Sequence, residues 1–229
     1  EAPDAVPRLR RFILDLAVRG KLVEQDASDE SSLVLLARIQ NAKSRLIEAK
    51  TLKKITLSTL APDDEPRVLP VGWTLSHLGD VYDVRDGTHA TPKYVDRGIP
   101  LVTSKNLSSG RLDFDDIKLI SQADHDEISR RSRVSRDDVL FAMIGSIGNP
   151  VIVDTDKPFS IKNVALFKYY DRDLSSPRFL LLYLQQVAHS MRATATGGLQ
   201  PFVSLGMLRS SPFNLPPLAE QHRIVAKVD

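Results

Sequence analysis

The chain has 229 residues, of which 42% are hydrophobic and 26% are charged, and its formal net charge is only +2 at pH 7. These values are typical of a globular protein and exclude disordered and fibrous classes. The sequence contains no cysteine, which excludes disulfides, thiolate zinc sites and a cysteine nucleophile.

Residues 1–66 are expected to form a helical region that ends in an acidic linker. Apolar residues at helical spacing predict a first helix over 8–19, with Gly20 placed to end it. A second helix is expected over 32–53, where a heptad-like seam is formed by Leu35, Ile39, Ala42 and Leu46. The alternative is an ordinary helix packed on a globular core. The proline-flanked acidic run 62–66 then indicates a linker into a separate domain.

Residues 67–215 show short apolar runs separated by turn residues, which predicts a domain of mixed α and β structure. Strands are expected at 81–84, 99–102, 117–120, 139–144, 151–153 and 161–170. One helix should follow Ser121, with Asp124 at the capping-box position, and another should follow Ser176. The fold class is therefore α+β, with an appended helical, coiled-coil scaffold.

Residues 216–229 are expected to begin a further scaffold helix. Pro217 suits a first helical position because its missing N–H would have no partner there. The spacing of one apolar face predicts a second seam, which consists of Leu218, Gln221, Val225 and Val228. A helix this short is marginal in isolation, so we expect it to pair with the helix over 32–53.

Enzymatic sites find little support in the sequence. Asn149-Pro150-Val151 lacks the second proline and the aromatic residue of an adenine methyltransferase signature, so a turn is favoured. Asp116-Ile117-Lys118 has the spacing of a nuclease metal site, but such triplets are common by chance. The five histidines lack metal-ligand spacing, and Ser146 lacks the nucleophile-elbow pattern. No catalytic residue and no metal site are predicted.

Two polar loops are equally suited to contacts with DNA and to ordinary connections between elements. Loop 86–93 supplies hydroxyl, imidazole and ammonium donors, and loop 194–200 lies in a stretch from 174 to 219 that contains no acidic residue. Arg192 is assigned to phosphate, while Thr88 and Gln200 are assigned to bases. The predicted DNA-binding residues are Thr88, His89, Thr91, Lys93, Lys105, Arg130, Arg131, Ser146, Lys162, Arg192, Thr194, Thr196, Gly197, Gly198 and Gln200.

Several motifs occur in an order that resembles one protein family. Pro-Pro-Leu-Ala-Glu-Gln-His-Arg-Ile-Val at 216–225 is similar to a segment in specificity subunits of type I restriction-modification systems. Further matches follow the family's order. They are Gly20-Lys21-Leu22, Leu69-Pro70-Val71-Gly72-Trp73, Leu78-Gly79-Asp80, Gly87 with Thr91-Pro92, Gly145-Ser146-Ile147-Gly148 and Gly197-Gly198-Leu199-Gln200. Each motif is weak alone, whereas the ordered set is specific.

The sequence has no apolar run near the roughly 20 residues needed to cross a bilayer, so a cytoplasmic location is expected. The resemblance implies a non-catalytic subunit that binds one half of a bipartite site in double-stranded DNA. Its helices would hold methyltransferase subunits, which carry the S-adenosylmethionine, and a restriction subunit would join them; no cofactor and no membrane are expected for this chain. The family usually has two recognition domains, so self-association of half-subunits is one possibility. Asp137 also departs from the glycine that the family often has there. A small metal-dependent nuclease and a coiled-coil protein-binding adaptor are the alternatives.

Overall fold

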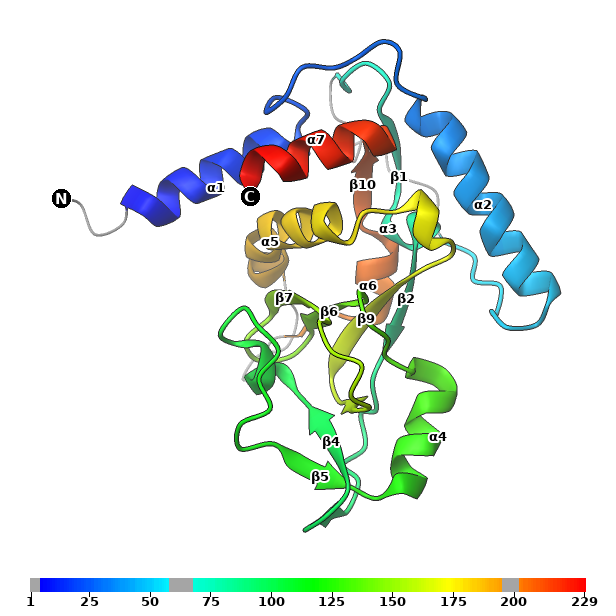
Figure 1. Ribbon diagram of the computed structural model, residues 1–229, viewed down its shortest axis with the longest axis vertical. Helices are drawn as coiled ribbons and strands as arrows, with labels where there is room; N and C mark the ends of the chain where they lie inside the picture. Colours follow the sequence, from blue (N-terminus) through cyan, green and yellow to red (C-terminus); the bar gives the residue numbers. More distant parts are fainter. Residues whose placement is uncertain (1–4, 58–67, 195–201) are drawn as a thin grey trace. The chain divides into compact units, whose positions relative to one another are not determined.

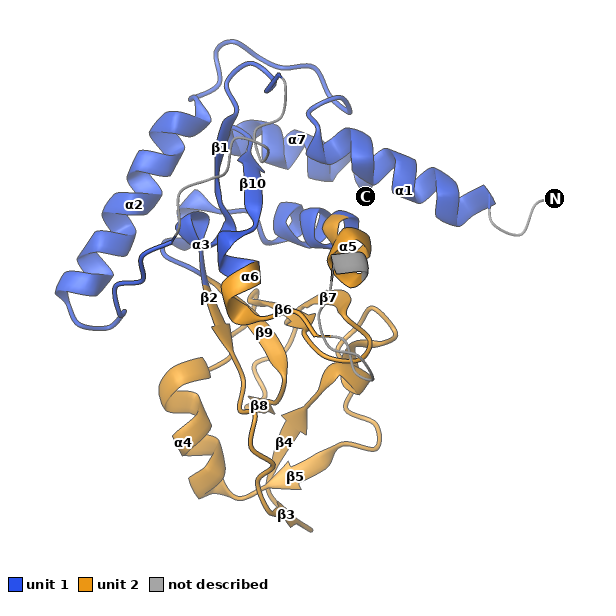
Figure 2. Ribbon diagram, turned by 180° about the vertical axis from the view of Figure 1, so that it is seen from behind, with its two compact units in different colours: residues 1–83, 169–186, 208–229 blue, residues 84–168, 187–207 orange. Residues whose placement is uncertain are grey.

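The computed structural model describes residues 5–57, 68–194 and 202–229, which form both helices and sheets (Figure 1). This confirms the α+β fold class. The chain divides into two compact units, shown in Figure 2. Unit 1 comprises residues 1–83, 169–186 and 208–229, and unit 2 comprises residues 84–168 and 187–207. The two units are defined by contacts in space. The predicted segments 1–66, 67–215 and 216–229 are divided along the sequence, and this division stays a prediction.

Unit 1 is mainly helical and contains one small sheet. Strand β1 (Thr74–His77) pairs antiparallel with β10 (Pro212–Leu215). The helices are α1 (Ala5–Val18), α2 (Ser32–Glu48), α3 (Leu78–Val81), η3 (Arg172–Leu174), the first part of α5 (Pro177–Thr194), the last part of α6 (Leu205–Ser210) and α7 (Leu218–Val228). No helix among the described residues is long and apolar enough to cross a membrane.

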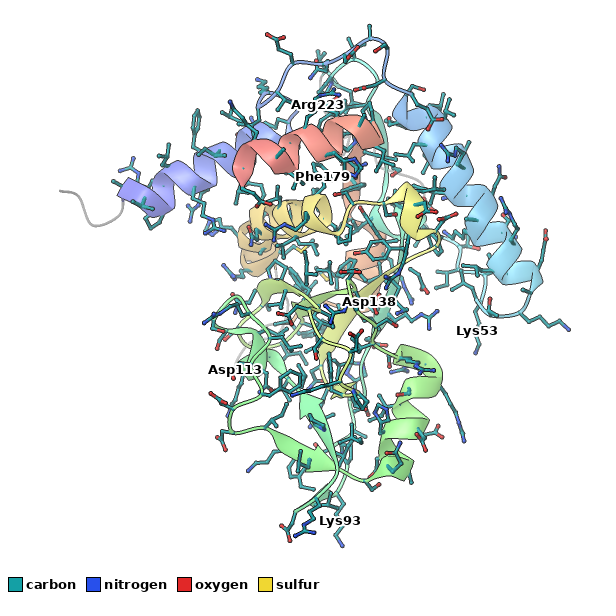
Figure 3. All side chains as sticks on the ribbon, in the orientation of Figure 1. Lys53, Lys93, Asp113, Asp138, Phe179 and Arg223 are labelled. Atoms are coloured by element: carbon teal, nitrogen blue, oxygen red, sulfur yellow. The ribbon has the colours of Figure 1, made fainter. Side chains whose placement is uncertain are left out.

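An aromatic cluster forms part of the core of unit 1. The ring of Phe213, on β10, lies edge to face with Tyr82, Phe179 and Tyr183, at centroid distances of 5.8, 6.4 and 4.6 Å. Phe179 is labelled in Figure 3. The Tyr183 hydroxyl donates to the carbonyl of Pro212 at 2.6 Å, so the buried phenol keeps a hydrogen-bond partner. Burial raises the pKa of Tyr183 well above its ordinary value. These contacts join α5 to the sheet.

Gly20 ends α1, as the sequence predicts. It has φ +63°, and Lys21 N–H donates to the carbonyl of Leu16 at 2.8 Å while Gly20 N–H reaches Ala17. These bonds form a Schellman motif, which satisfies carbonyls that the helix end leaves free. A Cβ at Gly20 would lie 2.6 Å from Pro70 Cγ. Glycine therefore suits both the left-handed turn and the close approach of the segment that leads into β1.

Helix α2 packs within unit 1 and ends earlier than the sequence predicts. It stops at Glu48 rather than near residue 53, and Lys50 then has φ +57°. Leu35, Ile39 and Ala42 are buried, and the main contacts of α2 are with α3 and η3. Figure 1 shows α2 apart from α7. The expected pairing of these two helices is therefore wrong, because four-three spacing defines an apolar face and not its partner.

Helix α7 buries a different face from the predicted seam. Its buried residues are Glu220, Gln221 and Ile224, whereas Leu218 and Val225 are only partly buried. Trp73 Nε1 donates to Glu220 Oε2 at 2.9 Å, which explains why a carboxylate occupies the inner face. Of the predicted seam, Gln221 is buried, and its side-chain amide donates to the carbonyl of Pro216 at 3.0 Å.

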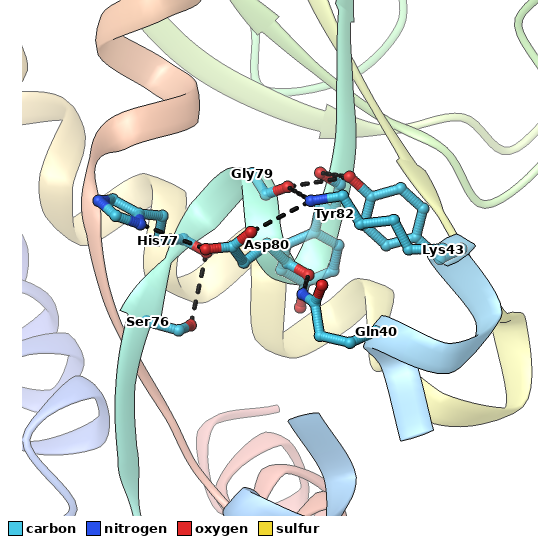
Figure 4. Close-up of polar contacts among 8 residues, drawn as sticks. Gln40, Lys43, Ser76, His77, Gly79, Asp80 and Tyr82 are labelled. Atoms are coloured by element: carbon cyan, nitrogen blue, oxygen red, sulfur yellow. Dashed lines mark hydrogen bonds and ion pairs between the residues drawn. The ribbon is translucent and has the colours of Figure 1, made fainter. Parts of the chain in front are cut away.

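Polar contacts fasten α2 to the short helix α3, as Figure 4 shows. Lys43 Nζ lies 3.1 Å from both the carbonyl of Gly79 and Oδ1 of Asp80. Gln40 Nε2 donates to the carbonyl of Asp80 at 2.6 Å, and His77 Nδ1 lies 3.2 Å from Asp80 Oδ2. Asp80 thus meets α2 through both its backbone and its side chain. The orientation of α2 is therefore set by directed hydrogen bonds as well as by its apolar seam.

Unit 2 contains two sheets that share a core. One sheet has the order β2 (Tyr82–Asp86), β9 (Val164–Tyr169), β6 (Val139–Ala142) and β7 (Gly148–Ile152), and its first two strands continue into unit 1. The other has the order β3 (Tyr94–Val95), β5 (Lys118–Ile120), β4 (Ile99–Val102) and β8 (Ser160–Ile161). Val102 and Ile161 of the second sheet pack in one cluster with Leu140 and Leu166 of the first.

The helices of unit 2 agree with the sequence more closely than its strands do. Helix α4 (Gln122–Ser132) begins after Ser121, whose hydroxyl accepts from Asp124 N–H at 3.1 Å, which confirms that cap. A 3₁₀ turn, η2 (Ser104–Leu107), follows β4. The strand expected over 139–144 ends at Ala142, and the run 161–170 divides into β8 and β9. Asp137 has φ +68°, a conformation that glycine adopts at lower cost.

Candidate nucleic-acid interface

The polar loop 86–93 is held against the turn between β8 and β9. Gly87 N–H donates to the carbonyl of Val164 and Thr88 N–H to that of Ile161, each at 3.0 Å. A Cβ on Gly87 would lie 2.1 Å from the carbonyl oxygen of Ile161, closer than any side chain tolerates. Glycine is thus required at position 87, because its backbone lies against the backbone of Ile161. This contact fixes the position of the rest of loop 86–93.

Side chains of the loop are tied to that turn as well. His89 Nε2 lies 2.8 Å from Asp86 Oδ2, and His89 Nδ1 lies 3.0 Å from Asn163 Oδ1. Arg131 Nη2 donates to the carbonyl of Gly87 at 2.9 Å. Lys162 Nζ donates to the hydroxyl of Thr91. His89 and Arg131 therefore position the loop, and their predicted contact with DNA stays a prediction.

A groove of about 610 Å³ opens beside this loop. Lys105, Ser146 and Lys162 of the predicted set line it together. Its other lining residues come from the strand ends and from the segment 103–118; they are Tyr94, Leu101, Thr103, Ser104, Asn106, Asp113, Asp115, Asp116, Ile117, Lys118, Ile144, Gly145 and Asn163. Segments far apart in the sequence thus meet at one concave surface of unit 2.

The groove presents charged groups of both signs that are unengaged among the described residues. Lys105, Lys118, Asp115 and Asp116 have exposed side chains with no ion-pair partner in the described part of the chain. Asp116 also has φ +48°, a conformation that costs free energy in a residue with a Cβ. Unpaired donors and acceptors on a concave surface are available to a polar ligand.

Apart from Lys105, sequence reasoning missed the contribution of segment 103–118 to the groove. Asp113 is exposed and lines the groove, and its Oδ1 accepts from Asp115 N–H at 2.8 Å. Figure 3 shows Asp113 at the periphery of unit 2. The spacing of Thr103 and Asn106 is a sequence signal that could have predicted the turn at the start of this segment. Thr103 N–H donates to Asn106 Oδ1 at 2.9 Å in a capping box that fixes the start of the segment.

Arg192 supports the loop that carries Ser146. Its Nε donates to the carbonyl of Ile147 at 2.6 Å. Gly148 has φ +103°, and a Cβ there would lie 2.8 Å from Arg192 Nη2. The arginine therefore braces this loop from α5. Its assignment to phosphate stays a prediction.

The remaining predicted residues lie elsewhere or outside the described residues. Arg130, on α4, pairs with Glu127 at 2.6 Å and does not line the groove. Lys93 is exposed at the periphery of unit 2 (Figure 3). The side chain of Thr194 and all of Thr196, Gly197, Gly198 and Gln200 fall outside the described residues. Over the described ranges, no three His, Asp or Glu side chains gather in a way that could hold a metal ion.

Solved structures share the fold of this chain. The HsdS subunit from Thermoanaerobacter tengcongensis aligns with 86% of this chain and 47% of its own, with a TM-score of 0.56 and 20% sequence identity. A chain from a structural study of assembly and conformational transition in the type I R-M system aligns with 98% of this chain and 50% of its own, also with a TM-score of 0.56. By fold, the chain is thus similar to about half of each of these two solved chains.

The sequence comparisons establish the family. The type I restriction modification DNA specificity domain matches residues 70–229, and the chain belongs to this family. The EcoAI specificity subunit of Escherichia coli is 31% identical over 98% of this chain, and the EcoBI specificity subunit of the same organism is 24% identical over 100% of it. The chain spans 39% and 44% of these relatives' lengths.

Proposed function

We propose that this chain reads one half of a bipartite site in double-stranded DNA, as the specificity component of a type I restriction-modification complex. The family assignment supports DNA recognition over the nuclease and adaptor alternatives. The observation that carries the proposal is the groove of unit 2, where unpaired lysines and carboxylates lie beside a loop fixed by Gly87.

The two signs of charge in the groove suit two kinds of DNA contact. Lys105 and Lys118 suit phosphate, which attracts cations regardless of sequence and in a salt-dependent manner. Asp115 and Asp116 are repelled by phosphate, whereas a carboxylate can accept a hydrogen bond from the amino group of cytosine in the major groove. Thr88 and Gln200 stay assigned to base edges. In this proposal, the lysines supply affinity and the other residues supply sequence preference.

The proposed partners follow from the family and from the length of the relatives. Methyltransferase subunits would bind S-adenosylmethionine and transfer the methyl group, and a restriction subunit would join the complete assembly. The described residues offer Leu218 and Val225 as partly exposed candidates for a subunit contact, whereas Leu35 and Ile39 are already covered within unit 1. Because the matched relatives are more than twice as long, the second half-site would be read by a second recognition domain or a second copy.

The central test measures DNA binding by the assembled methyltransferase. The wild-type complex first selects its preferred site from a random duplex pool, and affinities for that site and a scrambled one are then measured across a salt series. Lys105→Ala should weaken both duplexes equally and flatten the slope of log affinity against log salt by about 0.9. Asp116→Asn and Gln200→Ala should leave the slope unchanged and relax site preference by about tenfold each.

Lys53→Ala serves as the matched control, since Lys53 is exposed on unit 1 (Figure 3) and should not alter either duplex. Arg192→Ala tests the predicted phosphate contact and should resemble Lys105→Ala. If the Lys105, Asp116 and Gln200 variants all bind both duplexes as the wild type does, the groove is not the DNA-reading surface.

A separate test concerns chemistry. We expect the purified chain alone, incubated with DNA, Mg²⁺ and labelled S-adenosylmethionine, to show neither label transfer nor cleavage. Adding the methyltransferase subunit should restore label transfer to the preferred site. Transfer or cleavage by the chain alone would refute a purely recognition role.

A further inference from the structure

A second concave site lies in unit 2 beside α4. This cleft has a volume of about 710 Å³ and is lined by α4, the turn at 133–136 and the segment 153–159. It shares no lining residue with the groove. Phe159 lines it and is itself supported by Phe114, whose ring lies edge to face at 5.7 Å. The cleft therefore has a wall supported by aromatic packing, and it is separate from the groove proposed to bind DNA.

Cationic side chains predominate around the cleft. Arg130, Arg133, Arg136 and Lys157 line it, against the carboxylates Asp126 and Asp156. Arg136 binds Asp156 through two nitrogens, with Nη2 at 2.7 Å from Oδ2. This contact holds the pKa of Asp156 below its ordinary value, so Asp156 stays ionised and is committed to Arg136. Asp126 Oδ1 accepts from Gln122 Nε2 at 2.8 Å.

Two of the cations have no such partner. Within the described ranges, Arg133 and Lys157 are exposed and form no ion pair with a carboxylate. Arg130 forms an ion pair with Glu127, and both of these side chains are largely exposed, at 76% and 70%. An exposed pair of this kind contributes little free energy, so Arg130 can exchange its partner at low cost. The hydroxyls of Ser129 and Thr155 add polar groups to the same walls.

We propose that this cleft is an anion-binding site that takes a phosphate group between Arg133 and Lys157, with Arg130 as a third contact. Exposed cations on the walls of one cleft are available to an anion, and guanidinium groups bind phosphate through paired hydrogen bonds. The phosphate can belong to the DNA backbone outside the reading groove or to a free phosphorylated molecule. The site does not depend on the proposed function of the groove.

The first arm of the test uses pyrophosphate as the probe and the chain alone as the protein. Isothermal titration calorimetry at low salt should detect binding to the wild-type chain. The double variant Arg133→Ala, Lys157→Ala should weaken it at least tenfold, and Arg130→Ala should weaken it less. The charge-matched control, Lys53→Ala with Lys54→Ala, lies in unit 1 and should bind as the wild type does. Thermal unfolding should be unchanged in all variants, because the replaced side chains are exposed.

The second arm identifies the source of the phosphate, using DNA binding by the assembled methyltransferase. If the DNA backbone occupies the cleft, the double variant should weaken preferred and scrambled duplexes equally and flatten the salt slope by about 0.9 for each phosphate that is no longer neutralised. If pyrophosphate binding is abolished while DNA binding is unchanged, a free phosphorylated molecule is the ligand. No pyrophosphate binding by the wild type, or equal binding by the double variant, overturns the site whatever the groove variants show.

Discussion

Polar residues are used differently in unit 1 and in the groove of unit 2. In unit 1, Arg223 binds Asp29 through two nitrogens, at 3.1 and 2.6 Å, and Lys43 binds Asp80 at 3.1 Å. In the groove, Lys105 has no ion-pair partner among the described residues.

The difference separates residues that hold the fold from residues that await a ligand. A buried polar group without a partner costs about 1–3 kcal/mol. Within unit 1, the shielded carboxylate of Asp29 pairs with Arg223, and Oε2 of the buried Glu220 accepts from Trp73. An exposed charge carries little such cost, so the groove can present unpaired groups without weakening unit 2. Substitutions should therefore affect stability in unit 1 and ligand binding in the groove.

The largest effect is expected from a charge placed in the seam of α2. Leu35→Asp should destabilise the chain by about 5 kcal/mol, because Leu35 is fully buried and a carboxylate at this position would lose its hydration. Leu33→Asp is the matched control on the same helix, where the side chain is 65% exposed, and should change stability by under about 0.5 kcal/mol. Denaturant unfolding measures both. Equal effects would mean that α2 does not pack on unit 1 as described.

The next effect tests whether loop 86–93 is fixed by backbone approach. Gly87→Ala should cost about 3 kcal/mol, because its methyl group would collide with the carbonyl of Ile161. Gly206→Ala is the control, since the nearest atom to a Cβ there is Ser204 Oγ at 3.7 Å and the position is helical. Thermal unfolding of both variants would show the difference. A stable Gly87→Ala protein would contradict the described loop geometry.

A smaller, pH-dependent effect is expected at Glu220. Burial raises the pKa of its carboxyl above the ordinary value of 4.5, so the folded chain holds this proton more tightly than the unfolded chain. The stabilisation from this proton is complete below pH 4.5 and is lost as the pH rises through the folded pKa. Glu220→Gln should remove that loss while keeping an acceptor for Trp73.

Urea unfolding between pH 4 and pH 8 checks this prediction. The stability of the wild type relative to Glu220→Gln should fall as the pH rises. Glu127→Gln is the control, because that carboxylate is 70% exposed and its replacement should shift the curve little. A pH-independent difference between wild type and Glu220→Gln would show that the buried carboxyl is not the cause.

The smallest effect on stability is expected in the groove itself. Lys105→Ala and Lys118→Ala should each change the free energy of unfolding by under about 0.5 kcal/mol, because neither lysine has an ion-pair partner in the described part of the chain. Their effect should appear in DNA affinity alone. A loss of stability comparable to that of Gly87→Ala would place these lysines among the residues that hold the fold.

Much of the fold could be predicted because its signals are local. The end of α1 at Gly20 and the cap of α4 at Ser121 depend on residues close in sequence. The partner of α2 could not be predicted, since α3 is four residues long and gives no periodic signal. The strands β3 and β8 have two residues each, too short for a detectable alternation.

The candidate site was only partly predictable for a related reason. Thr88, in the polar loop 86–93, and Lys162 were both predicted to bind DNA, and the structure pairs them in a β-bridge. The sequence suggested for Asp116 only the role of a nuclease ligand. Its position in the groove could not be predicted, because it depends on the pairing of β5 with β4 and on a left-handed backbone at Asp116. Neither property is encoded within a few residues of Asp116.

The pairing of β1 with β10 has a consequence for how the protein is made. Thr74 pairs with Leu215, and the whole of unit 2 lies between these strands in the sequence. A ribosome adds about 5–20 residues per second, so β1 leaves the ribosome many seconds before its partner exists. Unit 2 is synthesised entirely within that interval. Closing such a long loop is slow, and the unpaired edge of β1 remains open to chaperones until β10 emerges.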